Sequence, residues 1–219
     1  MLEINAYINN DFKAIDSFDT IETVQGFFGD VHFSHFPVVE EGIYIGSIAA
    51  DDIDAFEFDK KIADYKYALS GFFARKSMFW MDVLEVFARN QTNVIPVLDN
   101  LNKYIGYYEI ADVIKNFYET PFVNELGGII IVEKGVLDFS MSQAVQIVES
   151  NQGKVLGIYI SEATTDKIQV TIKLALGGLN EIIQTFRRYG FEIISQHQED
   201  TYIINLKERS DYLDKYLNI

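Results

Sequence analysis

A pattern of strand, turn, strand and helix occurs twice in the sequence, roughly sixty residues apart. The first copy, residues 36–53, reads as a buried strand, an acidic turn through Gly42, a second strand and a helix that Asp51 and Asp52 open. The second copy is residues 95–113, in which Asp112 opens the helix. A period found only twice predicts paired modules with pseudo-twofold symmetry, because solenoids need three or more repeats.

Further elements precede each copy. Residues 14–16 read as a short strand. Thr20 is expected to cap a helix, because the apolar residues that follow it recur at the spacing of one helix face. In the second copy Ser77 is expected to cap a helix over residues 78–89. The helix after Asp52 is expected to run through Phe56, and the leading residues are expected to pack as a short helix on the first module. The sequence therefore predicts an α+β chain that begins with two βαββα modules.

The motif of a hydrophobic residue, Pro, Val, a hydrophobic residue and an acid, followed after a turn by Gly and then Asp-Ile or Asp-Val, resembles the cystathionine-β-synthase (CBS) domain. Its tandem arrangement resembles a Bateman pair, over about the first 125 residues. The resemblance implies modules at residues 1–66 and 67–125.

The resemblance also implies a cleft between the modules that binds adenine nucleotides. The ribose-binding aspartates map onto Asp52 and Asp112, and the phosphate-binding hydroxyl positions map onto Ala49 and Glu109. Here the chain departs from the family, since alanine cannot donate to a phosphate and glutamate repels one. The remaining positions implied for the site are apolar: Ile15, Pro37 and Pro96.

The two departures predict weak binding of di- or triphosphate nucleotides. Among adenosine compounds, adenosine itself, AMP or cationic S-adenosylmethionine remain the candidate effectors, and no obligatory cofactor is expected. The alternative is that Asp52 and Asp112 only cap helices, because the positive end of the helix dipole attracts aspartate whether or not a ligand is present.

A different pattern begins at residue 126. Two alternating segments, 154–160 and 167–176, and two glycine-bounded helices predict the order strand-helix-strand-strand-helix-strand of ferredoxin-like folds. This order resembles an ACT domain over residues 126–206. CBS modules followed by an ACT module resemble proteins of the acetoin-utilisation type. Residues 201–206 are expected to add a strand, and residues 207–219 a C-terminal helix.

The ACT resemblance implies an amino-acid site at the first strand–helix loop. The matching positions are Asp138, which could pair with an α-amino group, and Ser140. The alternative is that Asp138 is a turn residue in front of a helix that Ser140 caps.

Composition excludes several function classes. The formal charge of −15, placed mostly in the first 126 residues, opposes binding to nucleic acid. The absence of cysteine removes disulfides, thiol nucleophiles and thiolate-bound metals. His32 and His35 lack a third metal ligand, so no metal site is expected. No signal peptide or membrane-length apolar run is seen, and a cytoplasmic location is expected.

These observations predict a regulatory protein rather than an enzyme. We expect a homodimeric sensor, without a membrane segment, whose small effector is an adenosine-type ligand in the CBS cleft, an amino acid at the ACT-like module, or both. The alternative is a ligand-free CBS pair that serves as a scaffold for dimerisation or partner binding, which the departures at Ala49 and Glu109 favour.

Overall fold

The computed structural model describes residues 4–175 and 177–195 of the 219-residue chain. The chain divides into two compact units, Met1–Phe117 and Tyr118–Ile219, and each is described by itself. The strand expected at residues 201–206 and the helix expected at residues 207–219 lie outside the described residues.

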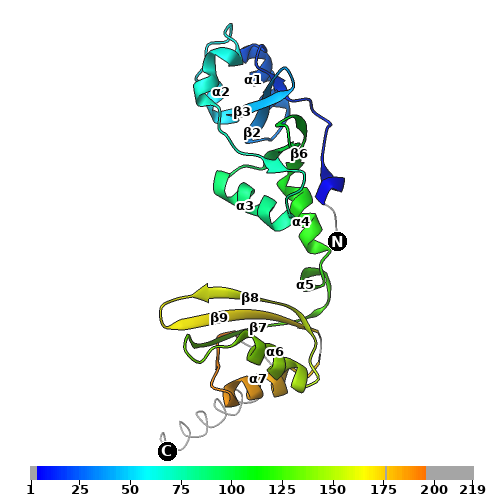
Figure 1. Ribbon diagram of the computed structural model, residues 1–219, viewed down its shortest axis with the longest axis vertical. Helices are drawn as coiled ribbons and strands as arrows, with labels where there is room; N and C mark the ends of the chain where they lie inside the picture. Colours follow the sequence, from blue (N-terminus) through cyan, green and yellow to red (C-terminus); the bar gives the residue numbers. More distant parts are fainter. Residues whose placement is uncertain (1–3, 176, 196–219) are drawn as a thin grey trace, which may run out of the picture. The chain divides into compact units, whose positions relative to one another are not determined.

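The first unit contains two three-stranded sheets of the same design (Figure 1). In each, a short first strand pairs in parallel with the second, and the second pairs antiparallel with the third. Both hairpins carry a bulge, after Val38 in one and after Val97 in the other. The strands are β1 (Ile15–Asp16), β2 (His35–Glu40) and β3 (Ile43–Ala49), then β4 (Ala74–Arg75), β5 (Val94–Leu98) and β6 (Tyr104–Glu109). The predicted twofold repeat is confirmed at this level.

Helices connect and flank these strands. They are η1 (Ile4–Tyr7), α1 (Ile21–Asp30), α2 (Ala50–Ile53), η2 (Ile62–Ala68), α3 (Trp80–Asn90) and α4 (Ile110–Tyr118). The Thr20 hydroxyl accepts a hydrogen bond from the Thr23 amide at 3.3 Å, so the predicted cap of α1 is confirmed.

Two sequence-based expectations about helix ends were wrong. The helix after Asp52 ends at Ile53 rather than at Phe56, and turns follow it. Ser77 is not the cap of α3, which begins three residues later; there Asp82 accepts a hydrogen bond from the Phe79 amide at 3.3 Å. The Asp82 carboxylate in the first turn thus accepts from the amide of the residue that precedes the helix, in place of a serine hydroxyl that accepts from an amide of the first turn.

Each module of the first unit has its own core. One core joins Ile15, α1 and β2 residues with Tyr107, and the other centres on Trp80, Val83 and Phe87. The leading residue Ile4 is buried in this second core, so the expectation that the lead-in helix packs on the first module was wrong for η1. Phe12, further along the lead-in, does pack on the first module, against Phe27 at 5.6 Å. The chain crosses from the second module to the first between η1 and β1.

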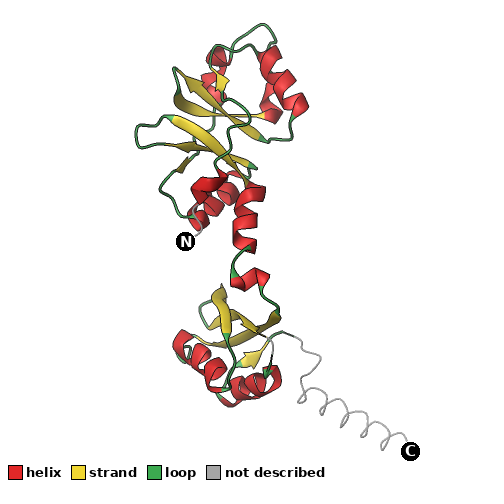
Figure 2. Cartoon of the chain, turned by 90° about the vertical axis from the view of Figure 1, so that its right-hand side faces the viewer, coloured by secondary structure: helices red, strands yellow, loops and turns green. Residues whose placement is uncertain are grey.

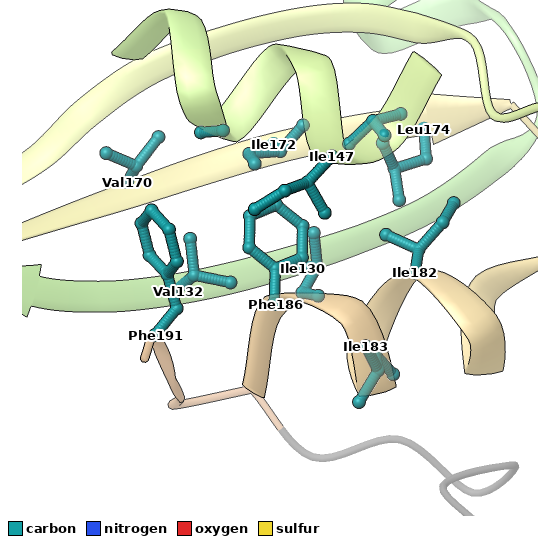
Figure 3. Packing of buried hydrophobic residues seen from close by; sticks show 12 residues of the cluster. Ile130, Val132, Ile147, Val170, Ile172, Leu174, Ile182, Ile183, Phe186 and Phe191 are labelled. Atoms are coloured by element: carbon teal, nitrogen blue, oxygen red, sulfur yellow. The ribbon is translucent and has the colours of Figure 1, made fainter. Parts of the chain in front are cut away.

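In the described part of the second unit, α5 is followed by the element order β7-α6-β8-β9-α7-β10, and the strands form a four-stranded sheet in the order β10-β7-β9-β8. Helices α6 and α7 cover one face of the sheet, and their apolar side chains form the core with those of the strands (Figures 2 and 3). The elements are α5 (Pro121–Asn124), β7 (Gly127–Gly135), α6 (Met141–Ser150), β8 (Val155–Ala163), β9 (Lys167–Ala175), α7 (Leu179–Arg188) and β10 (Glu192–Ile193).

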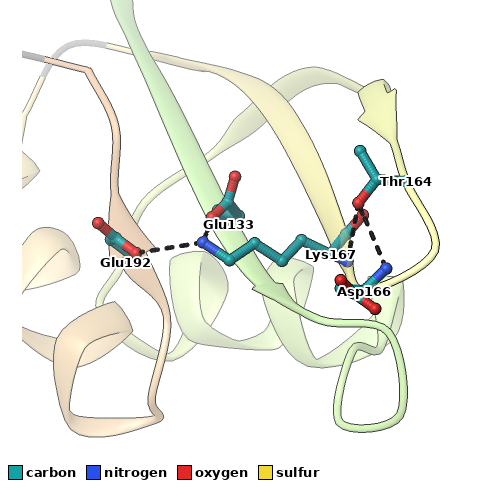
Figure 4. A network of polar contacts seen from close by, with 5 residues as sticks. All are labelled: Glu133, Thr164, Asp166, Lys167 and Glu192. Atoms are coloured by element: carbon teal, nitrogen blue, oxygen red, sulfur yellow. Dashed lines mark hydrogen bonds and ion pairs between the residues drawn. The ribbon is translucent and has the colours of Figure 1, made fainter.

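A network of polar contacts on this sheet links the strands β7, β9 and β10 (Figure 4). Lys167 of β9 pairs with Glu133 of β7 at 2.5 Å and lies 3.9 Å from Glu192 of β10. The nearby Glu133 carboxylate raises the pKa of Lys167. Thr164 accepts hydrogen bonds from the amides of Asp166 and Lys167, which closes the turn between β8 and β9.

Candidate functional site

The two modules of the first unit meet where β2 and β5 begin. The Ser34 amide donates to Asn93 Oδ1 at 2.8 Å, and the Asn93 amide donates to Ser34 Oγ at 3.2 Å. The Ser34 carbonyl then accepts from the Ala50 amide, and the Asn93 carbonyl accepts from the Ile110 amide. The start of α2 and the start of α4 are therefore held at equivalent positions, and with them the two aspartates that the sequence singled out.

We call the first of these places the Asp52 side and define it by Asp52, Asp51, Ala49, His35 and Phe72. Asp51 and Asp52 lie exposed in the first turn of α2, and Ala49 ends β3. His35 pairs with Ala49 across the hairpin, and its ring meets the Phe72 ring edge-on at 5.4 Å.

Opposing influences act on His35. Partial burial lowers its pKa, while the negative charges of Asp52 and Asp51 raise it by less. A neutral imidazole therefore lies beside two carboxylates, and one ring nitrogen contacts the Ser34 hydroxyl at 3.1 Å. This group can donate or accept hydrogen bonds according to its tautomer.

A pocket of 490 Å³ adjoins the Asp52 side through Phe72. Its apolar lining includes Phe72, Phe73 and Met78, and α3 contributes the polar residues Asp82, Glu85, Arg89 and Asn90. Arg89 is paired with Glu85 at 2.7 Å. Aromatic rings beside carboxylates suit a flat base attached to a sugar with free hydroxyls.

The equivalent place in the second module, the Asp112 side, consists of Asp112, Glu109, Asn9, Tyr107 and Phe12. Asp112 lies half-buried in the first turn of α4. Asn9 exchanges two backbone hydrogen bonds with Tyr107, at 2.8 and 3.0 Å, and its side-chain amide donates to Glu109 at 3.1 Å. Glu109 is thus engaged by the leading segment of the chain.

Tyr107 fills the interior of the Asp112 side. Its side chain is fully buried, and its ring packs on Phe33 at 5.7 Å and on Phe36 at 5.4 Å. Phe12 meets Phe33 edge-on at 5.8 Å, which extends the aromatic cluster. Burial, and to a smaller extent the charge of Glu109, raises the pKa of Tyr107 to about 12. The two sides therefore differ: aromatic packing occupies one, and a pocket adjoins the other.

The other residues implied by the resemblance lie inside the strands. Ile15 is buried in β1, Pro37 is paired with Ser47, and Pro96 is paired with Tyr107. In the second unit Ser140 caps α6 by accepting from the Gln143 amide at 3.4 Å. Asp138 is exposed in the turn that follows β7. Their roles in ligand binding remain predictions.

Sequence reasoning missed Tyr107, Phe72 and the contribution of α3. One signal was present: when the two copies are aligned on Gly46 and Gly106, Ser47 of the first copy corresponds to Tyr107 of the second. A serine at one position and a tyrosine at its counterpart indicate that the two sides have different free volumes. The α3 residues gave no such signal, because charged residues on a helix are usually solvated.

Within residues 4–175 and 177–195, no three His, Cys, Asp or Glu residues gather closely enough to hold a metal ion. The same described part of the chain includes no helix with the length and apolar character needed to cross a bilayer. The His32 carbonyl accepts a hydrogen bond from the Asn93 side chain at 2.7 Å.

The stability of the first unit should fall in mild acid because of His35. Its pKa is lower in the folded protein than in the unfolded chain, where it is about 6.5, so the unfolded chain takes up the proton first. The stabilisation is complete above about pH 6.5 and is lost as the pH falls below it. We expect His35→Gln to flatten the decline in urea midpoint between about pH 7 and 5. A matched His32→Gln variant, changed at an exposed position, should keep the decline; an equal change in both would contradict this role of His35.

No protein-family model matches the sequence, and no curated protein matches it. Among solved structures, the chain is similar to a CBS domain pair/ACT domain protein from Thermotoga maritima, with 16% identity over 54% of this chain and 98% of that one, at a TM-score of 0.49. The CBS domains of a transcriptional regulator from Streptococcus pneumoniae show 16% identity over 52% and 98%, at 0.47. The CBS domain of a bacterial CNNM/CorC family Mg²⁺ transporter, solved with ATP, shows 18% over 52% and 84%, at 0.42. These similar structures are of CBS-domain proteins.

Proposed function

We propose that the first unit is a CBS pair that binds an adenosine-type effector on the Asp52 side, and that the protein is a regulator without enzymatic activity. The observation that carries the proposal is the difference between the two sides. A 490 Å³ pocket with aromatic walls adjoins the Asp52 side, while the fully buried Tyr107 fills the Asp112 side.

The base would pack on the aromatic wall formed by Phe72 and Phe73. The sugar hydroxyls would donate to a carboxylate, for which Asp52 is the candidate by the CBS resemblance and Asp82 by its place in the pocket lining. His35, which contacts the Phe72 ring and whose pKa burial lowers, can exchange a hydrogen bond with the ligand.

Charge decides among adenosine compounds. Asp51, Asp52, Asp82 and Glu85 are negative, and the one arginine of the pocket lining is already paired with Glu85. A polyphosphate would add like charge, at a cost of order 1–4 kcal/mol for each close contact at effective dielectrics of 80 to 20. Adenosine and S-adenosylmethionine avoid this cost, and a cationic sulfonium gains attraction instead.

Regulation follows if the effector prefers one arrangement of the two modules. A ligand shifts such an equilibrium only by its differential affinity for the two arrangements. Such a shift would change the reciprocal Ser34–Asn93 hydrogen bonds, because these two residues hold the starts of both α2 and α4.

For the second unit we propose an ACT-like role, supported by its βαββαβ order and its sheet order β10-β7-β9-β8. Asp138, exposed in the loop between β7 and α6, is the candidate for an α-amino group. A homodimer belongs to the same proposal by resemblance to both families.

Titration calorimetry with adenosine, S-adenosylmethionine and ATP tests the main proposal. We expect saturable binding of one of the first two and weaker binding of ATP. Asp52→Asn should weaken binding at least about tenfold, since hydrogen bonds to charged groups contribute roughly 1.5–3 kcal/mol. Asp112→Asn is the matched control, because it removes the same charge from the equivalent helix turn, and it should change affinity less than about twofold.

Three results would count against this assignment. Tighter binding of ATP would contradict the electrostatic argument, and loss of binding in Asp112→Asn alone would place the ligand on the other side. No detectable binding of any of the three ligands at millimolar concentration would favour the second candidate function, a ligand-free scaffold. The observation that favours the scaffold is the aromatic packing of the Asp112 side, where Phe33, Phe36 and Tyr107 leave the interior filled.

A further inference from the structure

A second pocket of the first unit, of 370 Å³, lies where β6 begins. Tyr104 of this pocket and Glu109 stand at opposite ends of that strand, five residues or roughly 16 Å apart at about 3.3 Å each, and the pocket shares Phe12 with the Asp112 side. It is lined by Asn10, Phe12, Lys13, Ala14, Val39, Gly42, Lys103 and Tyr104. The CBS resemblance assigned no ligand to Lys13, Lys103 or Tyr104.

A fork in the chain creates this pocket. At Tyr107 the free edge of β6 pairs with Asn9, whereas Lys103, just before β6, pairs with Ile43 of the other hairpin. Residues 10–14 leave β6 between these two points to reach β1, which pairs with β2. The space where they diverge is walled by the leading segment on one side and by the turn at Gly42 on the other.

Two unpaired cations face this space. Lys13 and Lys103 are both exposed, and neither has an ion pair with any residue that the structure describes. The nearest acid along the chain from Lys103 is Asp99, whose Oδ1 already accepts from the amides of Leu101 and Lys103. In a chain with 33 acidic and 18 basic residues, two unneutralised ammonium groups on one pocket favour an anionic guest.

Tyr104 supplies an independent observation. Its hydroxyl is buried and has no hydrogen-bond partner among the described residues. Burial raises the pKa of Tyr104 well above its usual value, so the hydroxyl remains a donor at neutral pH. A buried donor without a partner costs free energy, which an acceptor on a bound molecule would recover.

We propose that this pocket binds a small organic anion, with its carboxylate or phosphate held by Lys13 and Lys103, and that the Tyr104 hydroxyl, which is closed to solvent in this structure, becomes accessible to an acceptor atom of the ligand on binding. Phe12, Ala14 and Val39 provide apolar wall for the body of the ligand, and Asn10 adds an amide. The lining thus combines apolar surface with a few convergent polar groups, which is the usual composition of a small-molecule site. This site is separate from the proposed adenosine site and carries the opposite charge.

The test is calorimetric titration of the full chain with phenyl phosphate, benzoate and inorganic phosphate. Phenyl phosphate and benzoate distinguish a phosphate from a carboxylate preference, and inorganic phosphate shows what the apolar body adds. The double variant Lys13→Gln/Lys103→Gln should weaken the best of these ligands at least about tenfold. Lys60→Gln/Lys115→Gln, two exposed lysines elsewhere in the unit, removes the same net charge and should change affinity less than about twofold.

Tyr104→Phe keeps the ring and removes the donor, so we expect affinity to fall by about three- to tenfold while the urea midpoint holds or rises. Equal weakening by both lysine pairs would show general charge attraction and overturn the site, as would the absence of binding by all three anions at millimolar concentration. Adenosine binding is the internal control: it should survive Lys13→Gln/Lys103→Gln, and anion binding should survive Asp52→Asn. Failure of one proposal is thereby distinguishable from failure of the other.

Discussion

Gly106→Ala is expected to lower the free energy of unfolding of the first unit by about 2 to 5 kcal/mol. Gly106 has φ +143°, a backbone conformation that residues with a Cβ rarely adopt. A Cβ at this position would lie 2.7 Å from the Asn9 carbonyl oxygen and 2.5 Å from Ile8 Cγ2. The Asn9 carbonyl cannot retreat without cost, because it accepts the Tyr107 amide at 3.0 Å.

Trp80 makes this effect measurable. It is the one tryptophan of the sequence and lies in the core that also holds Tyr108 of β6, so its fluorescence in a urea titration reports the unfolding of this unit. Gly26→Ala is the matched control: Gly26 lies inside α1 with nothing within 4 Å of an added Cβ. That substitution should stabilise by about 0.5–1 kcal/mol. Equal midpoints for the two variants would contradict the close approach of the leading segment to β6.

The same glycine position shows what the sequence could predict. Gly46 and Gly106 stand at matching places in the two copies, and the strand–turn–strand pattern around them was read correctly from apolar runs and turn residues. The sequence alone did not show why glycine is needed at these two positions. A Cβ at Gly46 would meet Leu69, and one at Gly106 would meet Ile8, and both neighbours come from segments far along the chain. The local sequence pattern predicts where strands and turns lie. Which distant segment packs across a strand depends on the tertiary structure, and the local pattern does not predict it.

The candidate site likewise has one part that the sequence predicts and another part that it does not. The aspartates were found because helix-opening Asp recurs at a fixed distance from each glycine, and the structure places both in equivalent first turns. The difference between the two sides depends on side-chain volume instead. His35, Ser47 and Tyr107 decide which side is filled, and their packing partners Phe72, Phe33 and Phe36 come from other elements. Spacing within one repeat cannot predict such contacts.

In the second unit, Phe186→Ala is expected to cost about 3–5 kcal/mol of unfolding free energy. Phe186 is fully buried on α7 and meets Phe191 edge-on at 5.2 Å (Figure 3). Its neighbours in the core come from both helices and from β7 and β9, so truncation leaves a cavity that several elements would have to close together. Partial closure leaves lining atoms without contacts, and that loss adds to the lost transfer free energy.

Two probes separate the units in this experiment. The core that contains Phe186 has all its described members in the second unit, and Trp80 lies in the first. Far-ultraviolet circular dichroism should therefore show an early loss of structure in Phe186→Ala, while the Trp80 fluorescence transition stays within about 0.5 kcal/mol of the parent protein. Leu137→Ala is the matched control, because Leu137 is 99% exposed and its truncation should also stay within about 0.5 kcal/mol. A shift of the Trp80 transition as large as that seen by circular dichroism would mean that the two cores unfold as one cooperative unit, and effector binding in the first unit would then be coupled to the stability of the second.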